Sequence, residues 1–206
     1  MEIIKKYFPK LKPHQNEQLA ALKPLYTIWN NQINVISRKD MDNFYLHHVL
    51  HSMAIAKFIQ FTEGTNIIDV GTGGGFPGIP LSILFPETKF TLLDSVGKKL
   101  KVIEAIKNEL DLSNITTIHS RSEDFRGNYD FIISRAVSKF PEFVKRTRHL
   151  ISKHPQNAIP NGILYLKGGD LTNETKPYKN KVFISNLNGW FTEPFFETKK
   201  LIHLPL

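Results

Sequence analysis

The first third of the chain carries two helical patterns. Over 14–33 the apolar side chains lie three or four residues apart, at Leu19, Leu22, Tyr26, Trp29 and Ile33. This spacing places them on one face of a helix, in which Pro24 is expected to introduce a kink. After a polar break at 37–40, a second helical pattern covers 41–59. We therefore predict that residues 1–62 form a helical extension.

A different pattern begins at Asn66, where a short β-branched run ends in glycines, as a buried parallel strand would. From here strand and helix patterns alternate. Strands are predicted at 66–70, 89–94, 115–119, 129–134, 162–167, 181–187 and 199–205. Helices are predicted at 79–85, 96–110 and 139–152. This alternation predicts an α/β fold of the Rossmann-like type, with a mostly parallel seven-stranded sheet in a domain over 63–206.

The last two predicted strands differ from the others in their connection. The loop between them contains Asn188, Gly189 and Pro194. It is too short for a full crossover helix, which two neighbouring parallel strands need. We therefore expect these strands to be antiparallel to each other and to complete the sheet at one edge.

Charge and cysteine content limit the chemistry. The chain has 27 Lys and Arg against 19 Asp and Glu, and its net charge of +8 favours a polyanionic partner or an anionic substrate. The absence of cysteine excludes disulfides, thiolate metal sites and a cysteine nucleophile. No apolar run approaches the roughly 20 residues that span a bilayer. The first residues do not resemble a signal peptide, so we expect a cytoplasmic protein that does not enter a membrane.

Part of the positive charge lies in one stretch, 139–153. Here a single acid, Glu142, accompanies five basic residues, which are Lys139, Lys145, Arg146, Arg148 and Lys153. A nucleic-acid contact would explain this composition. A solvated helix face would explain it equally well.

The glycine-rich segment between the first predicted strand and the first predicted helix of the α/β region is the strongest indication of a ligand. It extends from Asp69 to Gly78, and glycines at such a turn let a ligand approach the backbone N–H groups closely.

A phosphate-binding loop is excluded, because Ile79 and Pro80 stand where Lys and Ser or Thr are required. The dinucleotide fingerprint fits poorly, with Pro77 inside it. The pattern Asp-x-Gly-x-Gly-x-Gly fits without exception and is typical of class I methyltransferases, in which the turn accommodates S-adenosylmethionine. A glycine-rich turn without a ligand is the plain structural alternative.

Acidic residues after the next two strands agree with an adenosine ligand. Asp94 ends the second predicted strand, about 20 residues after the glycines, where a carboxylate can accept both ribose hydroxyls. Nicotinamide enzymes use the same arrangement, so Asp94 does not identify the cofactor. It could also cap the helix that begins near Val96. The segment 118–124 follows the third strand, and Glu123 is expected to face the adenine ring.

Longer motifs make the chain similar to a known family. It resembles the RsmG family, also called GidB, whose members methylate N7 of a guanine in bacterial small-subunit ribosomal RNA. The resemblance covers nearly the whole chain. It is carried by Trp29-Asn30-x-x-Ile33-Asn34, by His48-Val49-Leu50-His51-Ser52, by Asp69-Val70-Gly71-Thr72-Gly73-x-Gly75-Phe76-Pro77-Gly78-Ile79-Pro80-Leu81, by Thr91-Leu92-Leu93-Asp94-Ser95-x-Gly97-Lys98 and by Ile133-Ser134-Arg135-Ala136.

The resemblance implies S-adenosylmethionine as methyl donor and the 530 loop of 16S ribosomal RNA, in the small subunit, as substrate. It implies that Gly71 and Phe76 touch the cofactor and that Ser122 and Glu123 lie beside its adenine. Arg135 is expected at the mouth shared by cofactor and substrate. No metal is expected. No general base is expected either, because guanine N7 carries a free lone pair in the neutral base. A monomer is expected, and RNA is expected to bind through 1–62 and 139–153.

The chain departs from the family pattern in the second helical segment. Members commonly have Arg-His-x-x-Asp-Ser, whereas this chain has His47-His48-Val49-Leu50-His51-Ser52. Any role of that Arg and Asp is therefore in question here. We interpret the three histidines as packing residues in preference to RNA contacts. A metal site on His47 and His51 is disfavoured further, because the intervening residues lack the Glu of zinc proteases.

Other functions stay open at this level. A nicotinamide-dependent oxidoreductase, a non-catalytic RNA-binding protein, and a methyltransferase for another RNA or a small molecule are each compatible with parts of the pattern. The fourth strand argues against methylation of an exocyclic amine. It ends in Ser134-Arg135-Ala136, where those enzymes have Asp or Asn followed by Pro-Pro-Tyr.

Overall fold

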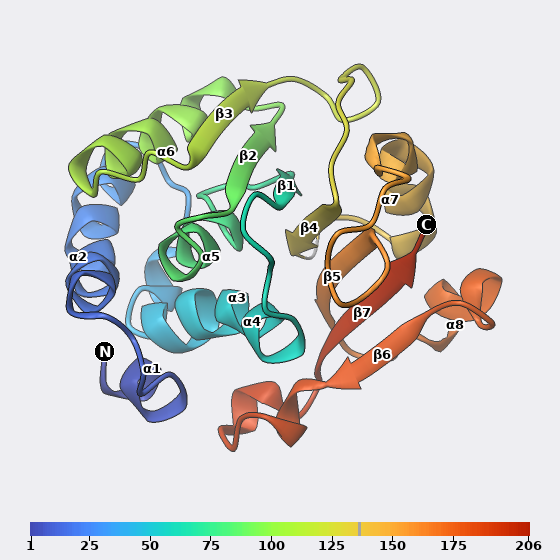
Figure 1. Ribbon diagram of the computed structural model, residues 1–206. Helices are drawn as coiled ribbons and strands as arrows, with labels where there is room; N and C mark the ends of the chain where they lie inside the picture. The colour runs from blue at the N-terminus through green and yellow to red at the C-terminus, as the bar shows by residue number, and fades with distance from the viewer. Residues whose placement is uncertain (136) are drawn as a thin grey trace.

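The predicted strands assemble into one seven-stranded sheet with the order β3-β2-β1-β4-β5-β7-β6 (Figure 1). The computed structural model describes residues 1–135 and 137–206. Strands β1 to β5 are parallel, and β7 pairs antiparallel with both β5 and β6, which confirms the predicted antiparallel pair. The bounds are β1 Asn66–Val70, β2 Lys89–Asp94, β3 Ile115–His119, β4 Phe131–Arg135, β5 Gly162–Gly168, β6 Phe183–Asn186 and β7 Lys199–Pro205.

Helices link the parallel strands at three of the four connections. They are α5 (Gly78–Leu84), α6 (Gly97–Glu109) and α7 (Phe140–Thr147), which is followed by a 3-10 turn at Arg148–Leu150. Between β3 and β4 the described chain forms turns and no helix. A short helix, α8 (Thr172–Thr175), and a 3-10 turn at Lys176–Tyr178 follow β5. The β3–β4 connection therefore leaves the loop after β3 free to form one wall of a pocket.

The extension 1–62 is helical, but its second predicted helix is not continuous. The helices are α1 (Glu2–Tyr7), α2 (Pro13–Asn30), a 3-10 turn (Arg38–Asp40), a π-helix (Phe44–Leu50), α3 (His51–Met53) and α4 (Ile55–Phe58). The prediction of a single helix over 41–59 is therefore wrong in its details.

Helix α2 also ends before Ile33, the last residue of its predicted apolar face. The side chain of Asn30 is responsible. Its Oδ1 accepts hydrogen bonds from the backbone N–H groups of Val35 and Ile36, at 2.8 and 3.0 Å, and its Nδ2 donates to the Ile36 carbonyl. These bonds favour a turn over further helix, because a local side chain satisfies backbone groups that a helix would otherwise pair.

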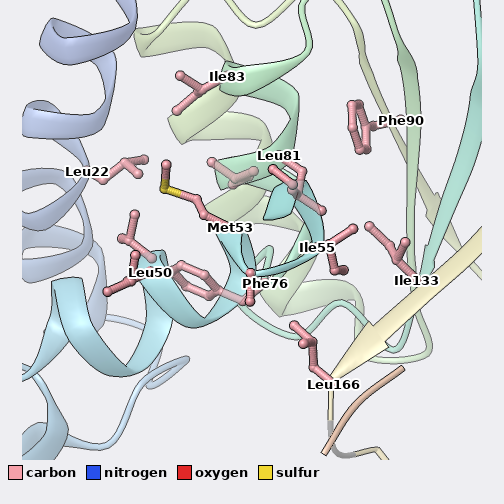
Figure 2. Packing of buried hydrophobic residues seen from close by; sticks show 14 of the residues in the cluster. Leu22, Leu50, Met53, Ile55, Phe76, Leu81, Ile83, Phe90, Ile133 and Leu166 are labelled. Atoms are coloured by element: carbon pink, nitrogen blue, oxygen red, sulfur yellow. The ribbon is translucent and has the colours of Figure 1, made fainter. Parts of the chain in front are cut away.

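Two apolar clusters cover the two faces of the sheet. The larger one joins the extension, α5 and α6 to the sheet, and Figure 2 shows Leu22, Met53, Leu81, Phe90 and Ile133 packed together in it. All five are at most 1% exposed. Burying each such side chain contributes about 1.5–3 kcal/mol. The extension thus shares its core with the sheet, and the division at residue 62 remains a prediction from sequence.

The smaller cluster lies under α7, on the opposite face, and includes Phe140, Phe143 and Tyr165. The hydroxyl of Tyr165 accepts from the Ser138 backbone N–H at 3.0 Å and donates to the Ser138 carbonyl at 2.8 Å. These bonds hold the chain just beyond β4. Among the described residues, no helix has the length and hydropathy needed to cross a membrane.

Candidate cofactor pocket

A pocket of about 650 Å³ opens at the carboxyl ends of the parallel strands. This edge is where ligands bind in open α/β sheets. All the predicted site residues except Phe76 line it. The complete lining consists of Val70, Gly71, Leu93, Asp94, Ser95, Val96, Lys99, Ser120, Arg121, Ser122, Glu123, Arg135, Val137 and Arg146.

The glycine loop, which lines the pocket at Gly71, has a conformation that side chains disfavour. Gly71, Gly73 and Gly75 have φ angles of 69°, 59° and 93°. In this left-handed region a residue with a Cβ is strained. A Cβ on Gly71 would in addition lie 2.8 Å from a methyl carbon of Val137. The absence of a side chain at Gly71 therefore keeps this wall of the pocket open.

Asp69, the first residue of the motif, holds the glycine loop in place by hydrogen bonds. Its Oδ2 accepts hydrogen bonds from the Thr72 hydroxyl at 2.7 Å and from the Gly78 backbone N–H at 2.8 Å. The carboxyl is fully buried, and its Oδ1 has no hydrogen-bond partner in the described structure. Burial raises the pKa of Asp69 to about 7, although the bonds from Thr72 and Gly78 act in the opposite direction.

This raised pKa predicts a pH dependence of stability. Because the folded-state pKa of Asp69 lies above the unfolded value of 3.8, the stability that the group contributes is fully present below pH 3.8 and is lost as the pH rises to about 7. The slope in this window is at most about 1.4 kcal/mol per pH unit. The Asp69→Asn variant does not titrate and should lack this decline.

Urea unfolding of both proteins at pH 4.5 and 7.5 measures the effect. The free energy of unfolding of the wild type should fall relative to that of the variant between these two pH values. A difference between the two proteins that stays constant with pH would contradict the assignment.

Asp94 ties the glycine loop to β2. Its Oδ2 accepts from the Gly73 backbone N–H at 2.8 Å and its Oδ1 from the Val96 backbone N–H at 2.9 Å. The capping role foreseen for Asp94 is thus a bond to Val96, the residue just before α6. Each carboxylate oxygen retains acceptor capacity, and the residue lies on the pocket wall. A diol placed here would find two oriented acceptors.

Ser122 and Glu123 line the pocket from the loop after β3. The Ser122 hydroxyl donates to Glu123 Oε2 at 3.0 Å. Hydrogen bonds to the Glu123 carboxylate, first from its own backbone N–H and then from Ser122, hold the pKa of Glu123 below its usual value. The carboxylate is therefore ionised at neutral pH, on a residue that lines the pocket.

Arg135 ends β4 and is partly buried at the pocket wall. Its guanidinium donates to the His47 carbonyl and contacts His48 Nδ1, both at 2.9 Å. It also lies 5.3 Å from the ring centroid of Phe76. The remaining motif residue of this strand end, Ala136, lies outside the described residues.

Phe76 is the one predicted site residue whose side chain is not on the pocket wall. It is 4% exposed and packs against Tyr26 and His48, with ring centroids 5.0 and 5.3 Å away. The Tyr26 hydroxyl also donates to the Gly74 carbonyl. The side chain of Phe76 therefore packs against the Arg135 guanidinium. Its contact with the cofactor remains a prediction.

The histidines of the second helical segment converge on an aspartate. His47 Nδ1 and His48 Nε2 each lie 2.5 Å from one oxygen of Asp40. His47 stacks on Phe195, with ring centroids 4.1 Å apart. His51 is 6% exposed and packs against the same phenylalanine. Packing is thus their main environment, as expected, but the bonds to Asp40 were not foreseen.

Sequence analysis also missed several pocket residues. Lys99 was not considered, and Arg121 and Arg146 were noted only as part of a motif and of a basic stretch. No local pattern marks them, because they reach the pocket from α6, from the loop after β3 and from α7. The positive charge that they bring together is visible only in the folded chain.

Comparison with known proteins decides the family. Residues 15–202 match the model of the GidB family, described as rRNA small subunit methyltransferase G. The protein belongs to the GidB family. Relatives named ribosomal RNA small subunit methyltransferase G include one from Bacteroides thetaiotaomicron, 55% identical over 98% of both chains. Another, from Porphyromonas gingivalis, is 53% identical over the whole of this chain and 93% of its own.

Solved structures place this GidB family member in the methyltransferase fold. A precorrin-6y C5,15-methyltransferase from Geobacter metallireducens matches with a TM-score of 0.57 at 12% identity, over 84% of this chain and 92% of its own. A SAM-dependent methyltransferase from Aquifex aeolicus matches with a TM-score of 0.56 at 14% identity, over 78% and 92%. At these identities the likeness concerns the fold, and it confirms the predicted Rossmann-like class I architecture.

Proposed function

We propose that the protein transfers the methyl group of S-adenosylmethionine to N7 of a guanine in the 530 loop of bacterial 16S ribosomal RNA. The observation that carries this proposal is the pocket formed by the glycine loop and Asp94, in a chain of the GidB family. We further propose that the protein acts as a monomer in the cytoplasm, where small ribosomal subunits are assembled.

The residues present fit S-adenosylmethionine. The pocket volume lies within the range usual for small-molecule sites. Asp94 would accept the ribose hydroxyls, Ser122 and Glu123 would border the adenine, and the bare backbone at Gly71 would allow the amino-acid arm to approach. Bound there, the cofactor supplies an electrophilic methyl group on a sulfonium.

The chain's own contribution is alignment, because the nucleophile needs no activation. Guanine N7 attacks with an existing lone pair, so holding it in line with the methyl group is sufficient. The carboxylates on the pocket wall, Asp94 and Glu123, are both assigned to cofactor binding. Arg135 would disfavour a developing positive charge on guanine unless it binds an anionic oxygen. We therefore assign Arg135 to such an oxygen, either the cofactor carboxylate or an RNA phosphate.

A second groove extends the pocket along α7 and supports RNA binding by the basic stretch. Its lining is mainly basic and consists of Glu123, Arg126, Glu142, Lys145, Arg146 and His149. Glu123 and Arg146 line both cavities, so the groove is continuous with the cofactor pocket. The extension 1–62 packs on the other face of the sheet. Of the two proposed RNA-binding regions, α7 lines this groove, whereas the extension reaches the pocket at Arg135 through His47 and His48.

Phosphate contacts in this groove predict a steep salt dependence of RNA affinity. Each contact removed should lower the slope of log affinity against log salt by about 0.7–0.9. Replacing Arg126 and Lys145 together with glutamine should reduce the slope by about 1.5, whereas Lys176→Gln and Lys179→Gln, exposed lysines near β6, should leave it unchanged. Fluorescence anisotropy with a 16S RNA fragment from 50 to 200 mM salt measures this. A flat wild-type affinity would contradict binding through phosphates.

The decisive experiment for the function is transfer of tritium from labelled S-adenosylmethionine into 16S RNA of undermethylated small subunits, followed by mapping of the modified base. Label at a guanine N7 in the 530 loop is expected. Label at another base, or in a small molecule only, would overturn the substrate assignment. Calorimetry with NAD(P) tests the oxidoreductase alternative. The absence of any signal with S-adenosylmethionine would favour a non-catalytic RNA-binding protein.

A further inference from the structure

The guanidinium of Arg135 is not balanced by direct contact with a carboxylate. In the described part of the chain, no ion pair includes Arg135. Its two side-chain hydrogen bonds go to the His47 carbonyl and to the ring of His48. Guanidinium groups have N–H donors only. The contact with His48 Nδ1 therefore requires that this nitrogen carries a lone pair and no proton.

The other ring nitrogen of His48 meets the opposite requirement. Nε2 lies 2.5 Å from Asp40 Oδ2. Burial acts to raise the pKa of Asp40, but the bonds from His47 and His48 hold it below its usual value, so the carboxylate is ionised and only accepts. Nε2 must then donate. The two neighbours together select one neutral tautomer of His48, with the proton on Nε2.

Burial and the nearby charge of Arg135 stabilise the same state. They lower the pKa of His48 to about 4, so the ring stays neutral over the working range of pH. The residue lies in the π-helix Phe44–Leu50, a rare geometry that occurs often at functional sites. The ring of Phe76 also lies against the guanidinium, 5.3 Å from its central carbon. Arg135 thus contacts an aromatic ring and a polarised imidazole, and it lines the pocket.

We propose that His48, oriented by Asp40, is a positioning residue for methyl transfer, which fixes the Arg135 guanidinium for contact with an anionic oxygen in the pocket. The chain Asp40–His48–Arg135 joins the helical extension to the end of β4. This extends the proposed function and rests on it, because it assigns to the extension a part in the reaction geometry.

Two near-isosteric variants separate the two bonds of His48. Glutamine places its amide nitrogen near the position of Nε2, which keeps a donor for Asp40 but removes the acceptor for Arg135. Asparagine places its carbonyl oxygen near the position of Nδ1 and does the reverse. We expect His48→Gln to lower kcat/KM about tenfold to a hundredfold and His48→Asn to stay within about fivefold of the wild type. After Arg135→Gln, adding His48→Gln should change the rate less than about twofold.

Both the cofactor and the RNA are used as probes, because either can supply the anionic oxygen. A weaker calorimetric affinity for S-adenosylmethionine in both His48→Gln and Arg135→Gln would identify the cofactor carboxylate. Unchanged cofactor affinity with a changed kcat or KM for RNA would identify a phosphate. Either pattern supports the proposal. An equal fall in kcat/KM in His48→Gln and His48→Asn would overturn it. A double variant, His48→Gln with Arg135→Gln, whose fall in kcat/KM equals the product of the two single falls would overturn it as well.

The tautomer itself gives a readout independent of activity. Nitrogen NMR of labelled protein at neutral pH should show His48 protonated at Nε2 and unprotonated at Nδ1, and a proton on Nδ1 would overturn the proposal. His203→Gln is the matched control, since His203 is a buried histidine that contacts a backbone carbonyl outside the pocket. It should affect thermal stability alone. A wild-type protein without rRNA methylation would contradict the proposed function, while the NMR result would still test His48.

Discussion

Replacing Arg135 with alanine should lower kcat/KM for rRNA methylation about 100-fold or more, while the protein stays folded. The residue stands at the carboxyl end of β4 on the wall of the cofactor pocket. A hydrogen bond to a charged group contributes about 1.5–3 kcal/mol, and the guanidinium can make two such bonds to one anionic oxygen group, so losing them lowers the rate by about two powers of ten or more. Tritium transfer to undermethylated subunits at several RNA concentrations measures the change.

The fold should tolerate this substitution, because the interactions lost are few. The His47 carbonyl and the His48 ring lose a donor, which costs about 1–3 kcal/mol. This loss is partly offset, since burial disfavours the charge and lowers the pKa of Arg135 to about 10. Arg135→Lys is the matched control. It keeps the charge but loses the planar fork, so an intermediate rate is expected. Turnover equal to that of the wild type in Arg135→Ala would exclude the proposed role.

Replacing Asp94 with alanine should weaken S-adenosylmethionine binding about 100-fold or more. The carboxylate holds the Gly73 and Val96 backbone N–H groups and offers its free lone pairs to the pocket. Its removal should take away the two charge-assisted bonds that we propose to a ligand diol, and it should release the glycine loop. Each bond to a charged group contributes about 1.5–3 kcal/mol, and 1.4 kcal/mol corresponds to a tenfold change in affinity.

Calorimetric titration with S-adenosylmethionine measures the loss, and Asp124→Ala provides the control. Asp124 is an exposed aspartate of the loop after β3 that does not line the pocket. Its removal should leave the affinity within about twofold of the wild-type value. If Asp94→Ala bound the cofactor normally, the assignment of the ribose subsite would be wrong. A parallel titration with NAD(P) should show no binding to the wild type.

These predictions depend on different parts of one pocket wall. Asp94 and the glycine loop, at the ends of β2 and β1, are expected to act on cofactor affinity. Arg135, which comes from β4 and contacts the helical extension, is expected to act at the reacting end. A variant that changes cofactor affinity alone would therefore point to the ends of β1 and β2, and one that changes the rate of methyl transfer alone would point to the end of β4.

Local sequence patterns were sufficient for the strands, the glycine loop and Asp94. Buried parallel strands appear as short β-branched runs, and the turn after β1 needs glycines at defined positions, so both leave a signature within a few residues. The acid at the end of β2 was predicted for the same reason, since its distance from the loop along the chain is nearly constant in such folds. The breakdown of the helix over 41–59 had no such signature.

The cluster of Asp40, His48 and Arg135 was decided by tertiary structure. From the sequence, Asp40 belongs to a polar break, the histidines are interpreted as packing residues, and Arg135 is expected at the mouth of the pocket without a partner. Their relation depends on the extension packing against the sheet, which brings residues nearly 90 positions apart within hydrogen-bond distance. The raised pKa of Asp69 has the same origin, because it results from burial. Composition and spacing describe what a residue can do, whereas burial and partners, which determine its charge and orientation, arise only when distant segments meet.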